Sequence, residues 1–226
     1  MPGDSSNAVP LGRRLATGAE MRVTGPTDRA AVVCVNGGQG SEVEGTWSAT
    51  LEWLVRRLAP RFPKLGFAEV RYRIKSWKRI EWCVADARAA IGETAAPRTI
   101  LLGFSMGGAV AIGVADDPSV EEVVGLAPWI PERLRLEPLI GRRFAVIQGQ
   151  LDRRLPGLPG VSPGSSRLGY ERALALGVEG SYTLIPRAVH GVAFRARWGA
   201  PIPFPRAGRW ADAVSLELGR FQALAG

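Results

Sequence analysis

The chain contains few of the side chains that bind metal ions or form disulfide bonds. Its 226 residues include one histidine and two cysteines. Cys34 lies in a short apolar run and Cys83 in a helical pattern, and they match no metal-binding spacing such as Cys-x-x-Cys. We therefore expect two buried, reduced thiols, and neither a metal ion nor an organic cofactor.

Long apolar runs are also absent. No stretch reaches the length of about 20 apolar residues that a membrane-spanning helix needs. Residues 1–10 are polar and lack the apolar segment of a signal peptide, and we expect them to form a disordered N-terminus. The sequence thus predicts a soluble, cytoplasmic protein with no membrane span.

Lysine is scarce, although the chain carries a net charge of +8. Arginine supplies nearly all of the positive charge, and the arginines are spread from Arg13 to Arg220 without a polybasic block. A dispersed basic surface biases the choice of partners without defining a function. A basic nucleic-acid binder is therefore the weakest alternative, and we do not expect nucleic acid as a partner.

The chain does contain an alternation of strand-like and helix-like segments. β-branched runs and alternating apolar and charged residues predict strands, and apolar residues at helical spacing predict helices. Residues 15–23, which turn at Thr17-Gly18, predict an antiparallel hairpin at the sheet edge. Repeated strand–helix units indicate an α/β fold, with a mainly parallel sheet and helices on both faces, in one domain over residues 11–226. Strands are expected at 30–35, 67–74, 99–104, 120–126, 144–148 and 181–185, and helices at 47–58, 82–91, 106–115, 170–176 and 210–224.

Ligands of such sheets bind beyond the carboxyl ends of the strands, so the residues that directly follow strands are candidates for a site. Ser105 follows the strand 99–104 in the segment Gly103-Phe104-Ser105-Met106-Gly107. A sharp strand-to-helix turn strains the serine and leaves no room for side chains at the flanking positions, which explains the glycines. The pattern indicates a nucleophilic serine at a helix N-terminus, where negative charge is stabilised.

A serine hydroxyl is a weak nucleophile and needs a base. The only histidine, His190, comes just after the strand 181–185 and precedes a glycine, and we expect it to be this base. The base needs an acid that fixes its orientation, and Asp152, after the strand 144–148, is the expected acid.

Other interpretations of the acid stay open. Asp152 could instead be a turn carboxylate that pairs with a neighbouring arginine. Asp116 and Asp117 compete with it, but they follow a helix and belong to the other end of the sheet. Glu132 is a weaker competitor, close to the strand that ends near Leu126.

A tetrahedral intermediate needs two donors for its oxyanion. One expected donor is the backbone N–H of Met106, the residue after the nucleophile. The other should come from the loop Asn36-Gly37-Gly38-Gln39-Gly40, with Gly38 favoured and Gln39 as the alternative, because glycines let a backbone approach the substrate. A dinucleotide loop would need a third glycine, and a phosphate-binding loop would need Gly-Lys-Ser/Thr.

Together these residues resemble the α/β-hydrolase family. The order Ser105, Asp152, His190 is that family's order of nucleophile, acid and base. The serine turn, the acid loop 149–156 and the His190-Gly191 turn match its pattern, and the resemblance extends from about residue 11 to 224. It implies an eight-stranded, mostly parallel sheet that begins with an antiparallel hairpin. Many members have His-Gly where this chain has Asn36-Gly37.

The resemblance also implies an activity. A serine hydrolase would cleave a carboxylic ester or thioester of a small acyl substrate through an acyl-enzyme intermediate. Residues 128–142 would form a short cap insertion, in which Trp129 is the expected substrate contact. The same fold hosts acyltransferases and peptidases, and these remain alternatives. So does a hydrolase-like protein that binds a ligand without turnover.

Overall fold

The computed structural model describes residues 12–153 and 160–223. The terminus expected to be disordered, residues 1–10, lies outside the described residues and stays a prediction. Within the described part, no helix is both long and apolar enough to cross a membrane.

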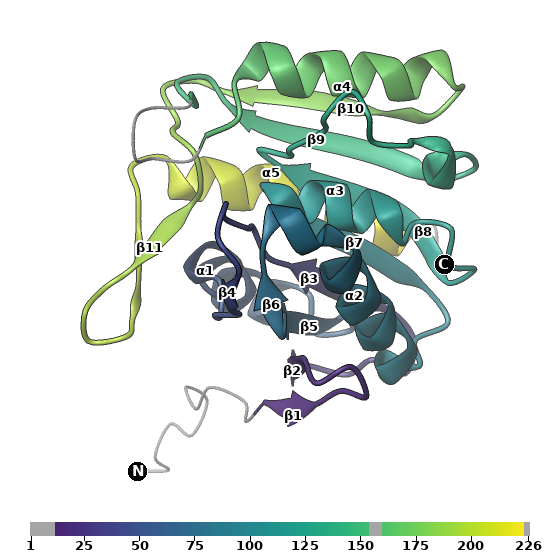
Figure 1. The fold of residues 1–226 in the computed structure, drawn as a ribbon, viewed down its shortest axis with the longest axis vertical. Coiled ribbons are helices and arrows are strands. Elements are labelled where there is room, and N and C mark those ends of the chain that lie inside the picture. Colours follow the sequence, from purple (N-terminus) through teal and green to yellow (C-terminus); the bar gives the residue numbers. More distant parts are fainter. Residues whose placement is uncertain (1–11, 154–159, 224–226) are drawn as a thin grey trace.

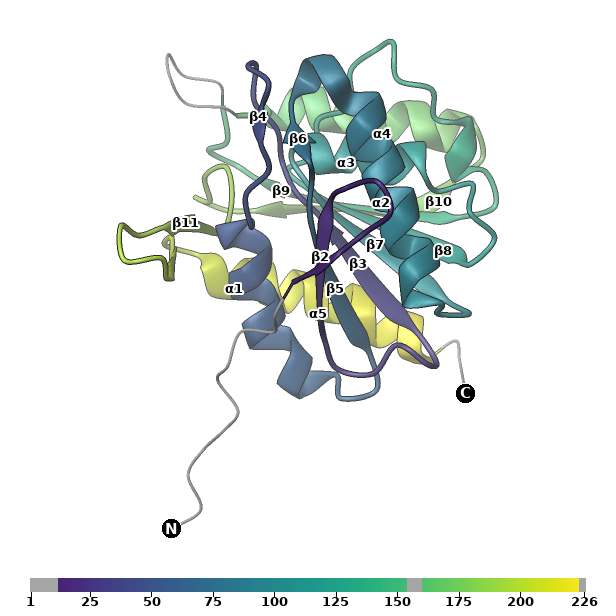
Figure 2. The same cartoon turned by 60° about the horizontal axis from the view of Figure 1, so that its bottom comes forward.

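An eight-stranded sheet forms the centre of the fold (Figures 1 and 2). Its strand order is β1-β2-β5-β3-β7-β8-β9-β10. β2 pairs antiparallel with β1 and β5, and all other neighbours run parallel. The prediction of a mostly parallel sheet with an N-terminal antiparallel hairpin is therefore confirmed. The strands are β1 (Arg13–Arg14), β2 (Glu20–Thr24), β3 (Ala31–Val35), β5 (Gly66–Arg71), β7 (Thr99–Phe104), β8 (Val120–Leu126), β9 (Arg143–Gly149) and β10 (Glu179–Ile185).

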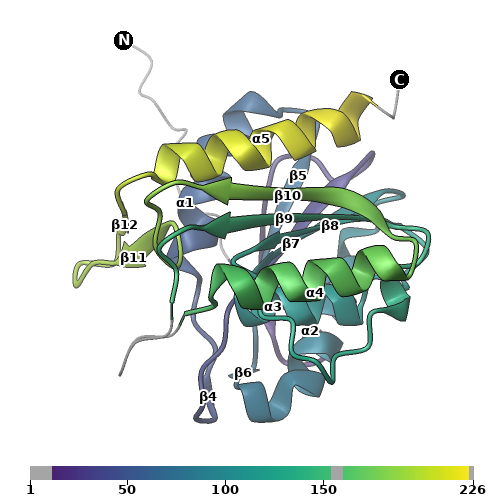
Figure 3. The same cartoon turned by 90° about the horizontal axis from the view of Figure 1, so that it is seen from above.

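Helices cover both faces of the sheet (Figure 3). α1 and α5 bury their apolar sides in one core, and α2, α3 and α4 bury theirs in the core on the opposite face. The strands between these cores are apolar on both sides, as expected of a buried parallel sheet. The helices are α1 (Ala49–Leu58), α2 (Ile80–Thr94), α3 (Met106–Gly113), α4 (Pro163–Ala175) and α5 (Ala207–Ala223).

The strand expected at 67–74 ends early. β5 stops at Arg71, and β6 (Ile74–Lys75) pairs instead with β4 (Val43–Glu44) in a separate two-stranded sheet. The backbone N–H of Arg73 donates to the buried Asp86 carboxylate of α2 at 3.0 Å. This contact turns the chain away from the central sheet and towards α2.

A hairpin after His190 is absent from the sequence prediction. β11 (Ala193–Arg195) pairs antiparallel with β12 (Pro201–Pro203), and the hairpin projects beside the sheet (Figure 1). Proline cannot donate to a ladder, so a segment with a proline at both ends does not read as a strand.

The two cysteines are free and buried, as expected. Burial raises the pKa of the Cys34 thiol well above its usual range, and burial raises the pKa of Cys83 to about 11. Because the thiolate is the reactive form, neither cysteine has the character of a nucleophile near neutral pH.

Candidate active site

Ser105 lies in a strained turn between β7 and α3. Its backbone has φ 55° and ψ −118°, a conformation that residues other than glycine rarely adopt. Ser105 is 8% exposed, and its backbone N–H donates to the carbonyl oxygen of Leu126 at 2.9 Å. Such strain persists only where the surrounding structure holds it, and it is concentrated at functional sites.

The glycines around Ser105 make this turn possible. A Cβ atom on Gly103 would lie 2.3 Å from the carbonyl oxygen of Gly107, and one on Gly107 would lie 2.2 Å from that of Val35. A Cβ on Gly108 would lie 2.4 Å from the Cβ of Pro128. The start of α3 therefore packs directly on neighbouring backbone and on Pro128.

His190 and Asp152 lie together at the same edge of the sheet. The His190 Nδ1 and the Asp152 Oδ2 are 2.7 Å apart. The Asp152 side chain is fully buried, and that of His190 is 12% exposed. The carboxylate therefore fixes the orientation of the imidazole through Nδ1 and leaves Nε2 for another partner.

The His190 turn packs against the residue that precedes Ser105. The imidazole and the Phe104 ring have centroids 5.1 Å apart, at an interplanar angle of 37°. Gly191 has φ 85°, and a Cβ there would lie 3.2 Å from the Phe104 Cζ. These contacts bring the histidine loop to the serine turn, although 85 residues separate Ser105 from His190 (190 − 105).

The competing carboxylates lie elsewhere. Asp116 pairs with Arg88 at 2.6 Å, and Asp117 accepts hydrogen bonds from Ser119, both beyond the C-terminus of α3. Glu132 lines a surface pocket beside α4. Asp152 is thus the carboxylate that the structure brings to His190.

The loop after β3 lies against the serine turn. The Gly37 N–H donates to the Asn36 Oδ1 at 2.7 Å, and the Asn36 Nδ2 donates to the Thr46 carbonyl at 2.9 Å. A Cβ on Gly37 would lie 3.3 Å from the Ser105 Cβ. Asn36 thus links the loop to the Thr46 carbonyl and accepts the hydrogen of the Gly37 N–H.

The two expected oxyanion donors come from neighbouring backbone segments. A Cβ on Gly38 would lie 2.2 Å from the Met106 Sδ, so the two residues are in close contact. In residues 12–153 and 160–223, neither backbone N–H donates to a protein acceptor. The Gln39 carbonyl accepts from the Trp77 N–H at 3.0 Å, and the Gln39 side chain bonds to Ser41 at the surface.

Two indole rings flank this region. The backbone N–H of Trp129 donates to the Ser105 carbonyl at 2.9 Å, and the Trp77 and Trp129 rings stack with centroids 6.2 Å apart. Both side chains are half-buried. Trp129 was expected from the sequence; Trp77, whose ring lies beside Gly38, was not among the expected site residues. The segment 128–142 contains one short 3-10 helix, Glu137–Leu139.

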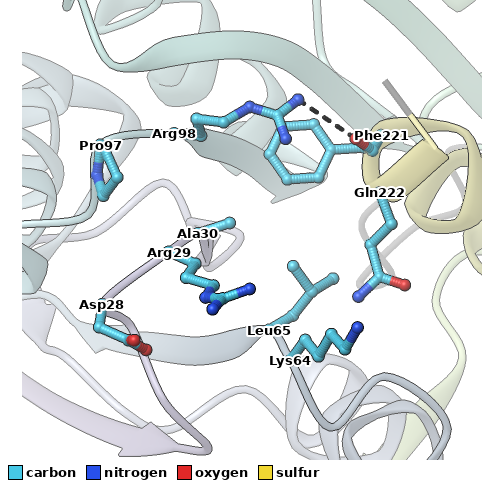
Figure 4. Close-up of a pocket in the computed structure, with 9 residues that line it drawn as sticks. All are labelled: Asp28, Arg29, Ala30, Lys64, Leu65, Pro97, Arg98, Phe221 and Gln222. Carbon is cyan, nitrogen blue, oxygen red and sulfur yellow. Dashed lines mark hydrogen bonds between the residues drawn. The ribbon is translucent and has the colours of Figure 1, made fainter. Parts of the chain in front are cut away.

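A pocket of about 550 Å³ lies at the opposite end of the sheet (Figure 4). Its lining residues precede β3, β5 and β7 or end α5, among them Arg29, Lys64 and Phe221. Arg98 forms one wall, donates to the Phe221 carbonyl at 3.2 Å and pairs with Glu121. This pocket shares no residue with the serine turn.

No protein-family model and no curated protein matches the chain. Solved structures do match it over most of its length. A sugar hydrolase from Lactococcus lactis has a TM-score of 0.70 at 15% identity, over 96% of this chain and 100% of that one. A propionate-bound esterase from Thermogutta terrifontis has a TM-score of 0.64 at 17% identity, over 96% and 94%. An α/β serine hydrolase without a lid, from Xanthomonas campestris, has a TM-score of 0.57 at 15% identity, over 84% and 88%. The chain therefore has the α/β-hydrolase fold.

Proposed function

We propose that the protein is a serine hydrolase that cleaves a carboxylic ester or thioester through an acyl-enzyme intermediate. Ser105 is the nucleophile, His190 the general base and then the general acid, and Asp152 the acid that orients His190. The backbone N–H groups of Met106 and Gly38 hold the oxyanion.

One observation carries this proposal. The only histidine of the chain bonds through Nδ1 to a buried aspartate and packs on the residue before a serine with a strained backbone. A histidine with only a structural role would not need to combine these three features. The pairing of Nδ1 with Asp152 favours the tautomer that has its free lone pair on Nε2, as a general base requires.

The proposed chemistry follows from these positions. The Ser105 Oγ attacks the acyl carbon while His190 takes its proton, and the negative charge on the carbonyl oxygen is held by two backbone N–H groups. His190 then protonates the leaving alcohol or thiol, and an acyl–Oγ bond remains. Water, deprotonated by His190, then attacks the acyl carbon. The acyl–Oγ bond breaks, His190 returns the proton to the Ser105 Oγ, and the carboxylic acid is released.

The surroundings support a small acyl group. Residues 128–142, the proposed short cap, bury Ile130 and Leu136 in the core, so they leave little chain to fold over the serine. Trp129 stays half-exposed beside Ser105 and is the proposed substrate contact. The Thermogutta terrifontis esterase was solved with propionate and with butyrate, which are acids of the size proposed here.

A fluorophosphonate probe tests the proposal directly. Such probes form a covalent bond with an activated serine, so we expect one label, on Ser105, located by peptide mass spectrometry. Ser119, a hydroxyl at the other end of the sheet, is the matched control: Ser119→Ala should label fully and Ser105→Ala should not. An unlabelled wild-type protein, or a label retained in Ser105→Ala, contradicts the assignment. A series of p-nitrophenyl esters of increasing acyl length would then define the acyl group.

A further inference from the structure

Gln148 is a buried polar residue in an otherwise apolar stretch of β9. The preceding residues, 144–147, are apolar and buried, and Gln148 itself is 0% exposed. Burying a side-chain amide costs free energy unless hydrogen bonds replace those to water. An aliphatic side chain would continue the pattern of the strand without that cost, so packing alone does not explain an amide here.

The amide of Gln148 donates towards the proposed acid. Its Nε2 lies 2.9 Å from the Asp152 Oδ2 and 3.0 Å from the Val161 carbonyl, with a longer contact of 3.3 Å to the Gly149 carbonyl. The Val161 N–H in turn donates to the Asp152 Oδ1 at 3.0 Å. Gln148, Asp152 and Val161 therefore form a closed ring of hydrogen bonds. The ring also fixes the orientation of the amide, because a flipped amide would place its oxygen against two other oxygens.

This ring holds the carboxylate that bonds to His190. The Asp152 Oδ2 accepts from both the His190 Nδ1 and the Gln148 Nε2, while Oδ1 accepts from Val161. Three donors from three directions prevent the carboxylate from rotating. Because hydrogen bonds to an ionised acceptor are stronger than neutral ones, the loss of one of them is expected to change the orientation of the group.

We propose that Gln148 is a positioning residue, which keeps the Asp152 carboxylate in the orientation that the His190 imidazole requires. The inference rests on the proposed function, in which Asp152 orients His190. Partners of this outer kind set ring orientation and are known to affect activity strongly at metal-binding histidines, and the same physical reasoning applies here. A Gln148 that merely closed the loop between β9 and α4 would need its bond to Val161 but not the one to Asp152.

Other ionisable groups near this ring of hydrogen bonds do not substitute for the Gln148 amide. The Tyr182 hydroxyl of β10 bonds to Ser166 at 2.9 Å and to the Pro163 carbonyl at 3.0 Å. Burial raises the pKa of Tyr182, the charge of Asp152 adds to this, and the phenol stays neutral. Arg167 lies over the Tyr182 ring at 3.9 Å, so its charge is directed at that ring.

Two substitutions separate positioning from packing. Gln148→Met keeps the size of the side chain and removes the donor, and we expect kcat for a p-nitrophenyl ester to fall about tenfold at every pH, with KM changed less than about twofold. Gln148→Glu places a second carboxyl group against Asp152, and two such groups share one proton. While that proton is present it substitutes for the amide N–H. Gln148→Glu should therefore be active while that shared proton is bound and lose activity as the pH rises and the proton is released, along an alkaline limb that the wild-type enzyme lacks.

The matched controls are Gln150→Met and Gln150→Glu. Gln150 lies two residues after Gln148, just beyond the end of β9; it is exposed and accepts from the Arg187 N–H at 3.0 Å without bonding to Asp152. Both controls should keep the wild-type kcat and pH profile. If Gln148→Met and Gln148→Glu fold, as judged by circular dichroism, and behave like these controls, the inference is overturned. A purely structural role predicts lower melting temperatures with an unchanged pH profile.

A second measurement does not need turnover. Because the chain has one histidine, the proton in the 2.7 Å bond from the His190 Nδ1 to Asp152 gives a single, assignable low-field NMR signal. We expect this signal in the wild-type protein and in Gln150→Met, and its loss or broadening in Gln148→Met. An unchanged signal in folded Gln148→Met contradicts the inference. If Ser105 fails to label, the proposed function fails, and the NMR signal still reports whether Gln148 holds Asp152.

Discussion

The Thr50 hydroxyl, on the first turn of α1, accepts a hydrogen bond at 3.1 Å from the backbone N–H of Val192, two residues after His190. The same hydroxyl accepts from the Ala193 N–H at 3.4 Å and lies 3.2 Å from the Ala193 carbonyl, to which it can donate. One buried side chain thus attaches the segment after the histidine to a helix 142 residues earlier in the chain.

Thr50→Val should loosen the histidine loop. Valine has the shape of threonine but cannot accept, so two buried N–H groups lose their partner, at a cost of about 1–3 kcal/mol in the free energy of unfolding. We expect kcat for a p-nitrophenyl ester to fall about tenfold, because His190 no longer holds one orientation. Thr94→Val is the control, since Thr94 is equally buried and bonds only within the end of α2. Equal kcat values in the two variants would count against this role.

Substitution of the three proposed catalytic residues should abolish activity without unfolding the protein. Ser105→Ala removes the nucleophile and His190→Ala removes the base. Asp152→Asn keeps the shape but is expected to lower kcat by about 10³–10⁴-fold, since it favours the wrong imidazole tautomer. Stopped assays with a short p-nitrophenyl ester, alongside melting curves, would check this. Full activity in Ser105→Ala or His190→Ala would refute the mechanism.

Gly38→Ala should damage the proposed oxyanion donor. The new Cβ would lie 2.2 Å from the Met106 Sδ and 2.9 Å from the Trp77 Cδ1, so the loop or these two side chains have to move. Loss of one such donor typically costs about 10²-fold in kcat. Gly40→Ala, on the same loop, is the matched control, because its Cβ would meet nothing closer than 3.9 Å. The prediction is wrong if both variants have the same kcat.

Glu122→Gln should stabilise the protein more at high pH than at low pH. Burial, with a contribution from the charge of Glu217, raises the pKa of Glu122 to about 7, although Arg143 at 3.6 Å opposes this. An unfolded glutamate ionises near 4.3, so the native state loses stability as the pH rises from about 4.3 to 7. A neutral glutamine avoids this loss, with an expected gain of about 1–3 kcal/mol above pH 7 and little below pH 5.

Melting temperatures at pH 5 and pH 8 would check this prediction. The control is Glu121→Gln, because Glu121 is the neighbouring residue on β8, is exposed, and pairs with Arg98 at 2.6 Å. Its effect should be small and the same at both pH values. An equal gain at both pH values in Glu122→Gln would show that relief of packing, not of charge, is responsible.

Local patterns were sufficient to predict most of the fold. The strand 99–104 matches β7, and 120–126 matches β8, because a β-branched apolar run bounded by glycine or polar residues has few other structures. The hairpin β11–β12 was missed, because prolines conceal its pairing, and β5 ended early because of Asp86, a residue of a distant helix. Contacts between distant segments decided both.

The candidate site divides in the same way. Ser105, Asp152 and His190 could be proposed from sequence because each is placed by a strand and parallel strands end at one edge. Gln148 and Thr50 could not, because their roles are defined only by what they touch. The one available signal was a glutamine in an apolar strand, which is a weak indication on its own.

At residue 105 the serine that the proposed reaction needs lowers the stability of the fold, because its backbone is strained. At φ 55° and ψ −118°, glycine has a lower conformational energy than any residue with a Cβ. Ser105→Gly should therefore melt at a higher temperature than the wild-type enzyme, whereas Ser105→Ala, which keeps the Cβ, should not. Under selection for thermal stability alone, variants of this protein should acquire glycine at residue 105 and become inert. Only a screen that also demands turnover would keep the serine.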